Sequence, residues 1–244
     1  MLPLFFAPTI NTSNTLEVLG DEAHHAIKVV RLSIGDELQI SDGAAHWAHA
    51  RIIEIKKNSF IVEIIERFDR AAKSPELVVV QALMKSDRAK EAIELLTVSG
   101  VDRIIPWQSE RSIAKWQNDL GEKWSTTARS AAKQARRPIL PLIDPLQSTS
   151  RIAEMSVRYS AGVELIVLHE EGELALSSLG QKLQASTSAA VVMIIGPEGG
   201  LTPNEIATFQ SQGAAVVRMG ESVLRSAHAG FAALAAVQTL MGRW

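Results

Sequence analysis

The amino-acid sequence predicts an α/β protein built in two parts. Short segments of β character, separated by turn residues, occupy residues 1 to about 70. A polar break follows at residues 71–75, and beyond it apolar runs alternate with segments of helical spacing. That alternation is typical of a mainly parallel sheet covered by helices. We therefore expect a small β domain over residues 1–72 and an α/β domain over residues 73–244.

Three strands are predicted in the first part, each rich in β-branched or apolar residues and each bounded by turn residues. Glycine, asparagine and aspartate accept the backbone angles that tight turns require. Short strands at this spacing are typical of a small β-barrel. The strands are Glu37–Ile40, Ala48–Ile55 and Phe60–Ile65, and the turns are Gly35-Asp36, Asp42-Gly43 and Lys57-Asn58.

The second part begins with a β-rich apolar run, 77–83, and a segment of helical spacing, 87–99. Its last helix, 227–241, is rich in alanine and apolar around most of its circumference, so we expect it to be buried on more than one side. Burial within one subunit and burial at a subunit interface both satisfy this pattern. The other expected strands are 103–106, 165–168, 191–195 and 215–219, and the other expected helices are 126–135 and 206–212.

Composition excludes several classes of site. The chain of 244 residues has no cysteine, which excludes disulfides, thiolate metal sites and cysteine nucleophiles. Its formal net charge of -2 gives no global attraction to nucleic acid, so any RNA contact must depend on local basic patches. No apolar run approaches the length of a membrane span, and a start broken by Pro3 and Pro8 is a poor secretory signal. We therefore expect a cytoplasmic protein with no membrane partner.

A glycine-rich turn at residues 196–200 carries the strongest chemical signal. It follows the apolar run 191–195, and its glycines let the main chain approach a ligand without an intervening side chain. Thr202 then starts a helix, with Glu205 in the position that completes a capping box. Open α/β sheets hold ligands at such strand-to-helix turns, although glycines in a turn of this kind also serve packing alone.

Two further junctions follow predicted strands, at Leu168-His169-Glu170 and at residues 219–226. The carboxyl ends of parallel strands meet at one edge of a sheet, where ligands bind. We therefore expect these two junctions and the glycine-rich turn to form the walls of one pocket.

The same segments resemble the RsmE family of ribosomal RNA methyltransferases, within the knotted SPOUT superfamily. The resemblance covers almost the whole chain in order. Residues 24–43 resemble the family's amino-terminal RNA-binding barrel, residues 82–88 its strand-to-helix segment, and residues 100–102 and 109–111 its next pieces. The most specific motifs are Ile195-Gly196-Pro197-Glu198-Gly199-Gly200-Leu201 and Met219-Gly220 followed by Val223-Leu224-Arg225-Ser226.

The resemblance implies a PUA-like amino-terminal β-barrel domain and a SPOUT α/β domain whose carboxyl-terminal loops form a deep trefoil knot. It also implies binding of S-adenosyl-L-methionine and an active site completed across a homodimer. The implied reaction is methylation of uridine N3 in the decoding region of 16S rRNA, either free or in the assembled small ribosomal subunit. The implied cofactor-binding residues are Leu168, His169, Glu170, Gly196, Pro197, Glu198, Gly199, Gly200, Met219, Gly220, Val223, Leu224, Arg225 and Ser226.

Three residues are candidates for the chemistry. Uridine N3 must lose its proton, and the negative charge that develops spreads onto O2 and O4, so a fixed cation nearby stabilises the reacting base. Arg225 is the candidate cation, with a salt bridge at a helix terminus or interface as the alternative. Glu198 is a candidate base, with a structural carboxylate bonded to turn amides as the alternative, and His228 is another candidate if it faces the pocket.

Basic residues elsewhere fit phosphate contacts. The cluster at 133–137 favours RNA binding, whereas a solvated charged face explains any single basic residue equally simply. The adjacent His24-His25 do not converge on a regular element and have no supporting carboxylate, so we expect no metal. The candidate RNA-binding residues are Lys28, Arg31, Lys85, Arg88, Lys133, Arg136 and Arg137.

Among the chain's departures from the family pattern, two bear on the candidate site residues. Where many relatives have threonine, glutamate and threonine after the motif arginine, this chain has Ser226, Ala227 and His228, and it has Lys133 where many have glutamate. These departures affect the base and the RNA contacts but leave the cofactor loops intact. Two other functions therefore stay open, namely ribose 2′-O methylation by another SPOUT enzyme and non-catalytic RNA binding.

Overall fold

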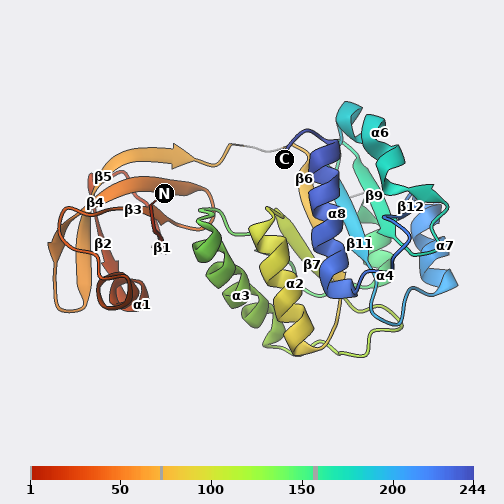
Figure 1. The fold of residues 1–244 in the computed structure, drawn as a ribbon, viewed down its shortest axis with the longest axis horizontal. Coiled ribbons are helices and arrows are strands. Elements are labelled where there is room, and N and C mark those ends of the chain that lie inside the picture. The colour runs from red at the N-terminus through yellow and green to blue at the C-terminus, as the bar shows by residue number, and fades with distance from the viewer. Residues whose placement is uncertain (1, 72–73, 156–158) are drawn as a thin grey trace. The chain divides into compact units, whose positions relative to one another are not determined.

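The computed structural model describes residues 2–71, 74–155 and 159–244 (Figure 1). The chain forms two compact units, one of residues 1–72 and 129–140 and the other of residues 73–128 and 141–244. The expected domain boundary between residues 72 and 73 lies outside the described residues. Helix α3 (Leu120–Ala135) contributes to both units, because its last turns and the segment after them group with the first unit.

A five-stranded sheet forms the first unit. It contains β1 (Leu4–Phe6), β2 (Thr15–Leu19), β3 (Glu37–Ser41), β4 (His46–Ile55) and β5 (Ser59–Asp69) in the order β1-β3-β4-β5-β2. The pairs are antiparallel except β1 with β3. The three strands expected from sequence are confirmed as β3, β4 and β5. A short helix α1 (Gly20–His24) and a π-helical segment η1 (His25–Val30), neither of which was expected, join β2 to β3.

Alternate residues of these strands face the core of the first unit. Leu38 and Ile40 of β3 and Ile52 of β4 are fully buried in it, as the period of two in a strand requires. A second small cluster forms where Ala132 of α3 and Leu140 pack on the side chains of β1. Residues 129–140 therefore belong to the first unit by packing, although they follow part of the second unit in sequence.

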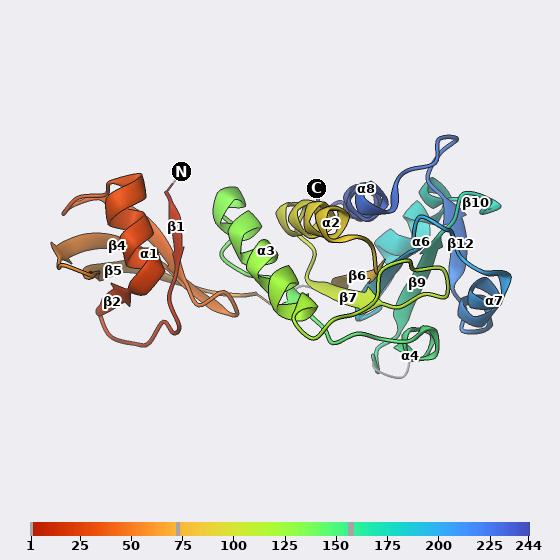
Figure 2. The same cartoon turned by 90° about the horizontal axis from the view of Figure 1, so that it is seen from below.

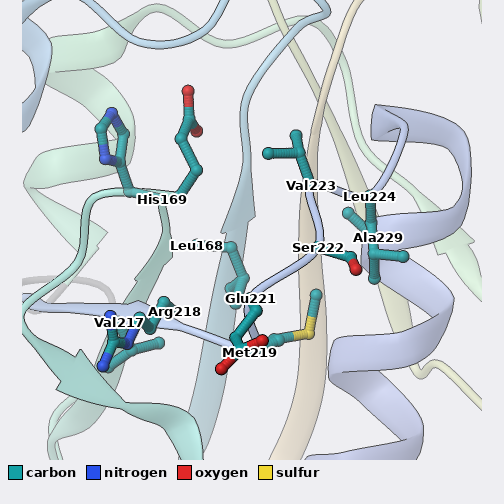
Figure 3. Close-up of a pocket in the computed structure, with 12 residues that line it drawn as sticks. Leu168, His169, Val217, Arg218, Met219, Glu221, Ser222, Val223, Leu224 and Ala229 are labelled. Carbon is teal, nitrogen blue, oxygen red and sulfur yellow. The ribbon is translucent and has the colours of Figure 1, made fainter.

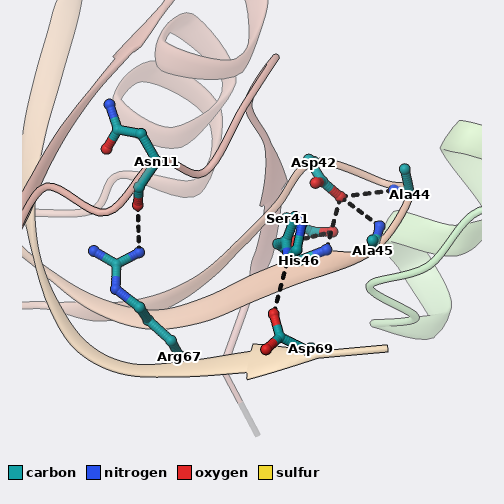
Figure 4. A network of polar contacts seen from close by, with 8 residues as sticks. All are labelled: Asn11, Ser41, Asp42, Ala44, Ala45, His46, Arg67 and Asp69. Carbon is teal, nitrogen blue, oxygen red and sulfur yellow. Dashed lines mark hydrogen bonds and ion pairs between the residues drawn. The ribbon is translucent and has the colours of Figure 1, made fainter. Parts of the chain in front are cut away.

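The expected turn at Asp42-Gly43 has a specific polar structure (Figure 4). Asp42 Oδ1 accepts hydrogen bonds from the backbone N–H groups of Ala44 (2.7 Å), Ala45 (2.9 Å) and His46 (3.0 Å). Burial alone would raise the pKa of the Asp42 carboxyl, but these bonds to its charged form lower the pKa below its ordinary value. Gly43 adopts a φ of 78°, which only glycine takes readily.

A seven-stranded sheet forms the centre of the second unit, and all its pairs are parallel. Its order is β10-β12-β9-β11-β6-β7-β8, so the chain returns to the middle of the sheet with β11 and again places β12 between two earlier strands. The strands are β6 (Glu76–Ala82), β7 (Arg103–Trp107), β8 (Leu142–Ile143), β9 (Val163–Leu168), β10 (Leu174–Ala175), β11 (Ala190–Ile195) and β12 (Ala215–Arg218).

Helices cover both faces of this sheet (Figure 2). On one face, α2 and α8 pack against each other and against side chains such as Val79 and Met193. On the other face, α4 and α7 cover side chains such as Val80 and Ile194. The expected α/β architecture is confirmed. The helices are α2 (Ser86–Val98), α4 (Thr149–Ala153), the 3-10 helix η2 (Leu176–Leu179), α6 (Gly180–Ala185), α7 (Pro203–Ser211) and α8 (Ser226–Leu240).

The carboxyl-terminal helix α8 is buried on the side that faces the sheet. Its buried residues include Ala233, Leu234 and Val237, and it packs against α2, α6, β6 and β11. Phe231 and Ala235 are half-buried. Among residues 2–71, 74–155 and 159–244, no helix is both long enough and apolar enough to cross a membrane. The same residues contain no group of three or more histidine, aspartate and glutamate side chains placed to hold a metal ion.

Candidate active site

Three loops meet at the carboxyl edge of the parallel sheet. Leu168, the last residue of β9, is in register with Ile195 of β11 and with Val217 of β12, so the three strands end level with one another. The loops that follow them line two adjoining cavities of about 260 Å³ and about 130 Å³. Leu168, Leu224 and other residues line both cavities. The expected convergence of three strand-to-loop junctions is therefore present.

The first loop follows β9 and is held against β12. The His169 N–H donates to the Val217 carbonyl oxygen at 2.9 Å, and the Gly172 N–H donates to the His169 carbonyl oxygen at 3.1 Å. His169 Nδ1 accepts from the Glu171 N–H at 3.1 Å, which orients the imidazole. Gly172 is buried, and a Cβ there would lie 2.6 Å from the carbonyl carbon of Val217. Glycine is therefore required for this close backbone approach.

We expect Gly172→Ala to lower the free energy of unfolding by about 2 kcal/mol, because the added methyl group meets backbone atoms that cannot rotate away. Urea unfolding measures this change. Gly220→Ala is the matched control, since a Cβ on that loop glycine has no atom within 4 Å. Equal stability of the two variants would contradict the steric explanation.

The second loop, at residues 196–202, is the glycine-rich turn. Gly200 adopts a φ of 72° and its N–H donates to the Pro197 carbonyl oxygen at 3.0 Å. The predicted capping box is confirmed, because Thr202 Oγ1 accepts from the Glu205 N–H at 3.2 Å and Glu205 Oε2 accepts from the Thr202 N–H at 2.9 Å. Glu205 is buried, and its other oxygen accepts from the Glu110 N–H at 2.9 Å.

Arg111 braces this turn from outside the cavities. Its Nη1 donates to the carbonyl oxygen of Gly199 at 3.1 Å and, more weakly, to that of Leu201 at 3.4 Å. A Cβ on Gly199 would lie 3.2 Å from Arg111 Cβ. The glycine at this position therefore faces the arginine and serves packing. The sequence of the turn does not indicate a contact with Arg111, because the two segments are 88 residues apart.

The third loop follows β12 and leads into α8 (Figure 3). Met219, Leu224 and Ala229 lie on one side of the smaller cavity, and His169 lies on another. Val223, on the same loop, is 75% exposed. Arg225 is the N-cap residue of α8, its carbonyl oxygen accepts from the N–H groups of His228 and Ala229, and it lines the larger cavity.

The larger cavity has carboxylates and a cation at its walls. Glu170 and Glu198 contribute the carboxylates, and Arg225 contributes the cation. His228 does not line either cavity within the described residues, and its Nε2 is 2.9 Å from Glu91 Oε1 on α2. The hydrogen bond from His228, and to a smaller extent the one from Arg88, lowers the pKa of the Glu91 carboxyl below its ordinary value. The geometry therefore places His228 with a surface carboxylate, whereas Glu198 lines the larger cavity.

Most of the expected cofactor-binding residues lie together. With the exception of Gly199, all of them line one or both cavities. Ile195, Leu201 and Ala229 also line the larger cavity and were not expected from sequence. A weak signal was available for Ala229, which lies one helical turn after Arg225. The residues confirmed as lining are Leu168, His169, Glu170, Gly196, Pro197, Glu198, Gly200, Met219, Gly220, Val223, Leu224, Arg225 and Ser226.

The candidate RNA-binding residues fall in both compact units. Lys28 and Arg31 are exposed at η1, and Arg136 lines a separate cavity of the first unit together with His25 and Lys133. Lys133 Nζ is 2.8 Å from Glu22 Oε2, and both side chains are largely buried. This ion pair attaches α3 to the first unit. The remaining candidates are Arg137, which is half-buried, and the exposed Lys85 and Arg88 of the second unit, of which Arg88 pairs with Glu91.

Known families match both parts of the chain. The RNA methyltransferase domain matches residues 72–238, and the RNA methyltransferase PUA domain matches residues 18–65. Ribosomal RNA small subunit methyltransferase E of Mycobacterium bovis is 34% identical over 247 residues, which cover 99% of this chain and 93% of that protein. The protein of the same name from Bacillus subtilis is 26% identical over 238 residues, which cover 93% of this chain and 91% of that protein.

Solved structures share the fold over the full length. Ribosomal RNA small subunit methyltransferase E from Neisseria gonorrhoeae, bound to S-adenosyl methionine, has a TM-score of 0.85 at 24% identity and covers 98% of each chain. A probable rRNA-methyltransferase from Porphyromonas gingivalis has a TM-score of 0.81 at 28% identity and covers 99% of each chain. By full-length similarity, and by its RNA methyltransferase and PUA domains, the chain belongs to the ribosomal RNA small subunit methyltransferase E family.

Proposed function

We propose that this protein methylates N3 of a uridine in the decoding region of 16S rRNA, using S-adenosyl-L-methionine, during maturation of the small ribosomal subunit in the cytoplasm. The observation that carries the proposal is the meeting of three strand-end loops around one cavity in a chain of this family. The fold and the family support the reaction class, and the cavity supplies a place for it.

The residues of the cavity fit the cofactor. Leu168, Leu201 and Leu224 provide apolar surface for a flat adenine ring, and Gly196 and Gly200 leave backbone groups open to it. The carboxylates of Glu170 and Glu198 suit the cationic amino and sulfonium groups. When bound, the cofactor supplies the methyl group. The protein holds the two partners in one geometry, which is the main source of rate in such a transfer.

Arg225 has the position to stabilise the uracil. It lies at the rim of the larger cavity, at the start of α8, where its backbone is held by the first turn of the helix. A guanidinium there donates hydrogen bonds to the uracil oxygen that gains negative charge as N3 loses its proton. Glu198, which lines the same cavity, accepts that proton in the proposed mechanism.

The strand order supports a knotted second domain, residues 73–244, with a PUA-like domain before it. The chain returns twice to the interior of the sheet, with β11 between β6 and β9 and with β12 between β9 and β10. We place the knot in the loops after β11 and β12. The exposed Val223 at the cavity rim, together with the half-buried Phe231 and Ala235 of α8, supports a homodimer that covers this apolar surface. Sedimentation at micromolar concentration tests the dimer, and a monomer would contradict it.

Lys28 and Arg31 carry the simplest test of the RNA contacts. Both are exposed, and Arg31 adopts a φ of 64°, so asparagine is a suitable replacement there. We expect Lys28→Ala/Arg31→Asn to reduce the slope of log affinity for 16S rRNA against log salt by about 1.4 to 1.8, because two phosphate contacts are lost. Filter binding at several salt concentrations measures the slope.

Lys133→Ala is the contrasting variant in that experiment. It leaves the largely buried Glu22 carboxylate with a more distant cation, Arg129 at 3.7 Å. We therefore expect lower stability of the first unit rather than a selective change in the salt slope. An unchanged slope in Lys28→Ala/Arg31→Asn would remove these two residues from the RNA interface.

The modified nucleoside is the decisive measurement for the proposed function. Purified protein is incubated with labelled S-adenosylmethionine and either bare 16S rRNA or small subunits from a strain that lacks the protein. Digestion and mass spectrometry should show N3-methyluridine in the decoding region, and comparison of the two substrates identifies the one used. A 2′-O-methylated nucleoside would assign the other SPOUT reaction. No labelled nucleoside and no cofactor binding by calorimetry would assign non-catalytic RNA binding.

A further inference from the structure

A buried glutamine joins the glycine-rich turn to the start of α8. Gln81 lies in β6, next to Ile195 of β11, and is fully buried. Its Nε2 donates to Ser226 Oγ at 3.1 Å, and Ser226 Oγ donates to the Gly196 carbonyl oxygen at 2.5 Å. Gly196 and Ser226 both line the larger cavity, whereas Gln81 does not.

The direction of these hydrogen bonds follows from the available protons. The Gly196 carbonyl oxygen can only accept, so the single hydroxyl proton of Ser226 is directed to it. Ser226 Oγ must then accept from the amide of Gln81. This orientation of the amide leaves Gln81 Oε1 buried with no hydrogen-bond partner among the described residues. A buried acceptor without a partner costs free energy, so this glutamine is not the side chain that stability alone favours.

The helix is shaped to accept the same amide. Gly230 lies one turn after Ser226 in α8, and a Cβ on it would lie 3.3 Å from Gln81 Oε1 and 3.3 Å from Leu96 Cδ2. The glycine therefore lets α8 approach β6 closely enough for Ser226 to reach Gly196. Three elements, β6, the turn after β11 and the first turn of α8, are joined by one short polar chain.

We infer that Gln81 is a positioning residue for the cofactor site, acting through Ser226 to hold the Gly196 carbonyl and the amino terminus of α8 at a constant separation. The inference rests on the proposed function. It explains a buried polar side chain on an otherwise apolar sheet face, where Leu77 and Val79 precede it. Arg225, directly before Ser226, is placed by the same contact.

The test compares cofactor affinity with stability in the absence of cofactor. Calorimetric titration with S-adenosylmethionine should show about tenfold weaker binding for both Gln81→Leu and Ser226→Ala. The double variant should bind no more weakly than Ser226→Ala, because both changes break the same chain. The unfolding midpoint of cofactor-free Gln81→Leu should not fall, since the substitution also removes the unpaired oxygen.

Two further variants keep the test decisive. Ser226→Thr retains the hydroxyl group and should retain affinity. Gln238 is another buried glutamine, which lies in α8 away from the cavities, and its Nε2 donates to the Ser99 carbonyl oxygen at 2.8 Å. Gln238→Leu removes this hydrogen bond. It should lower the unfolding midpoint without changing affinity. If Gln81→Leu does not fold, Gln81→Met replaces it.

Wild-type affinity in Gln81→Leu, or additive losses in the double variant, would overturn the inference. Failure of the wild-type protein to bind S-adenosylmethionine would instead overturn the proposed function.

Discussion

Arg225→Ala is expected to lower methyl-transfer turnover by about 10²-fold to 10³-fold, the loss typical when one fixed donor to a developing anion is removed. The free energy of unfolding should change by no more than about 0.5 kcal/mol. The side chain is exposed and forms no ion pair with any other residue in the described ranges. Single-turnover methylation of the rRNA substrate, together with urea unfolding, measures the two effects separately.

Two control variants sharpen the test of Arg225. Arg225→Lys keeps the charge but loses the planar pair of donors, so turnover should lie between that of the wild-type protein and that of Arg225→Ala. Arg151→Ala removes another exposed arginine, on α4 at the opposite face of the sheet, and should leave turnover unchanged. Near-normal turnover in Arg225→Ala would show that the motif arginine is only a helix-terminus residue.

Arg103→Ala is expected to lower the free energy of unfolding by about 3 kcal/mol, at the lower end of the range for breaking a buried ion pair. Arg103 Nε is 2.9 Å from Glu76 Oε1, and Nη1 is 2.6 Å from Asp144 Oδ1. Desolvation alone would lower the pKa of Arg103, but the bonds and charges of Asp144 and Glu76 raise it above its ordinary value. Removing the guanidinium takes away the ion pair that Arg103 forms with each of two largely buried carboxylates.

Urea unfolding measures this loss, and Arg51→Ala is the matched control. Arg51 pairs with Glu37 at 2.7 Å, but both side chains are more than 40% exposed, so its loss should cost less than about 1 kcal/mol. Arg103 begins β7 at the amino edge of the parallel sheet, opposite the cavities. Turnover at low temperature should therefore be retained in Arg103→Ala. A loss of turnover with normal stability would contradict a purely structural role.

Much of the fold could be predicted because its strands are unusual in composition. The strands β6 and β11 are buried on both faces and read as continuous apolar runs, which are easily recognised. Short or irregular elements left no such signal. The two-residue strands β8 and β10 depend on pairing with distant strands, the π-helical segment η1 was not expected, and α3 begins at Leu120, before the expected residue 126.

In the candidate site, too, the features with a local sequence signal could be predicted and those that depend on distant contacts could not. The glycine-rich turn and its capping box could be predicted because glycine, proline, threonine and glutamate have local backbone effects. The contacts of Arg111 and Gln81 could not be predicted from the sequence, since their hydrogen-bond partners are 88 and 145 residues away in the chain. The sequence predicted Lys133 to be part of a basic RNA-binding cluster, whereas in the structure its ammonium group donates a hydrogen bond to the carboxylate of Glu22, which is 111 residues away in the chain.

The sequence by itself determined the class of the fold, the three loops and the family to which the chain belongs. Those features depend on local backbone preferences, on hydrophobic periodicity and on short motifs, which are all properties of residues that are close together in the sequence. Tertiary structure alone decided the strand order, which places β9 between β11 and β12 and so brings together the three loops that the sequence predicted to converge. Parallel strands pair through backbone groups common to every residue, so no local signal specifies which strand lies beside which.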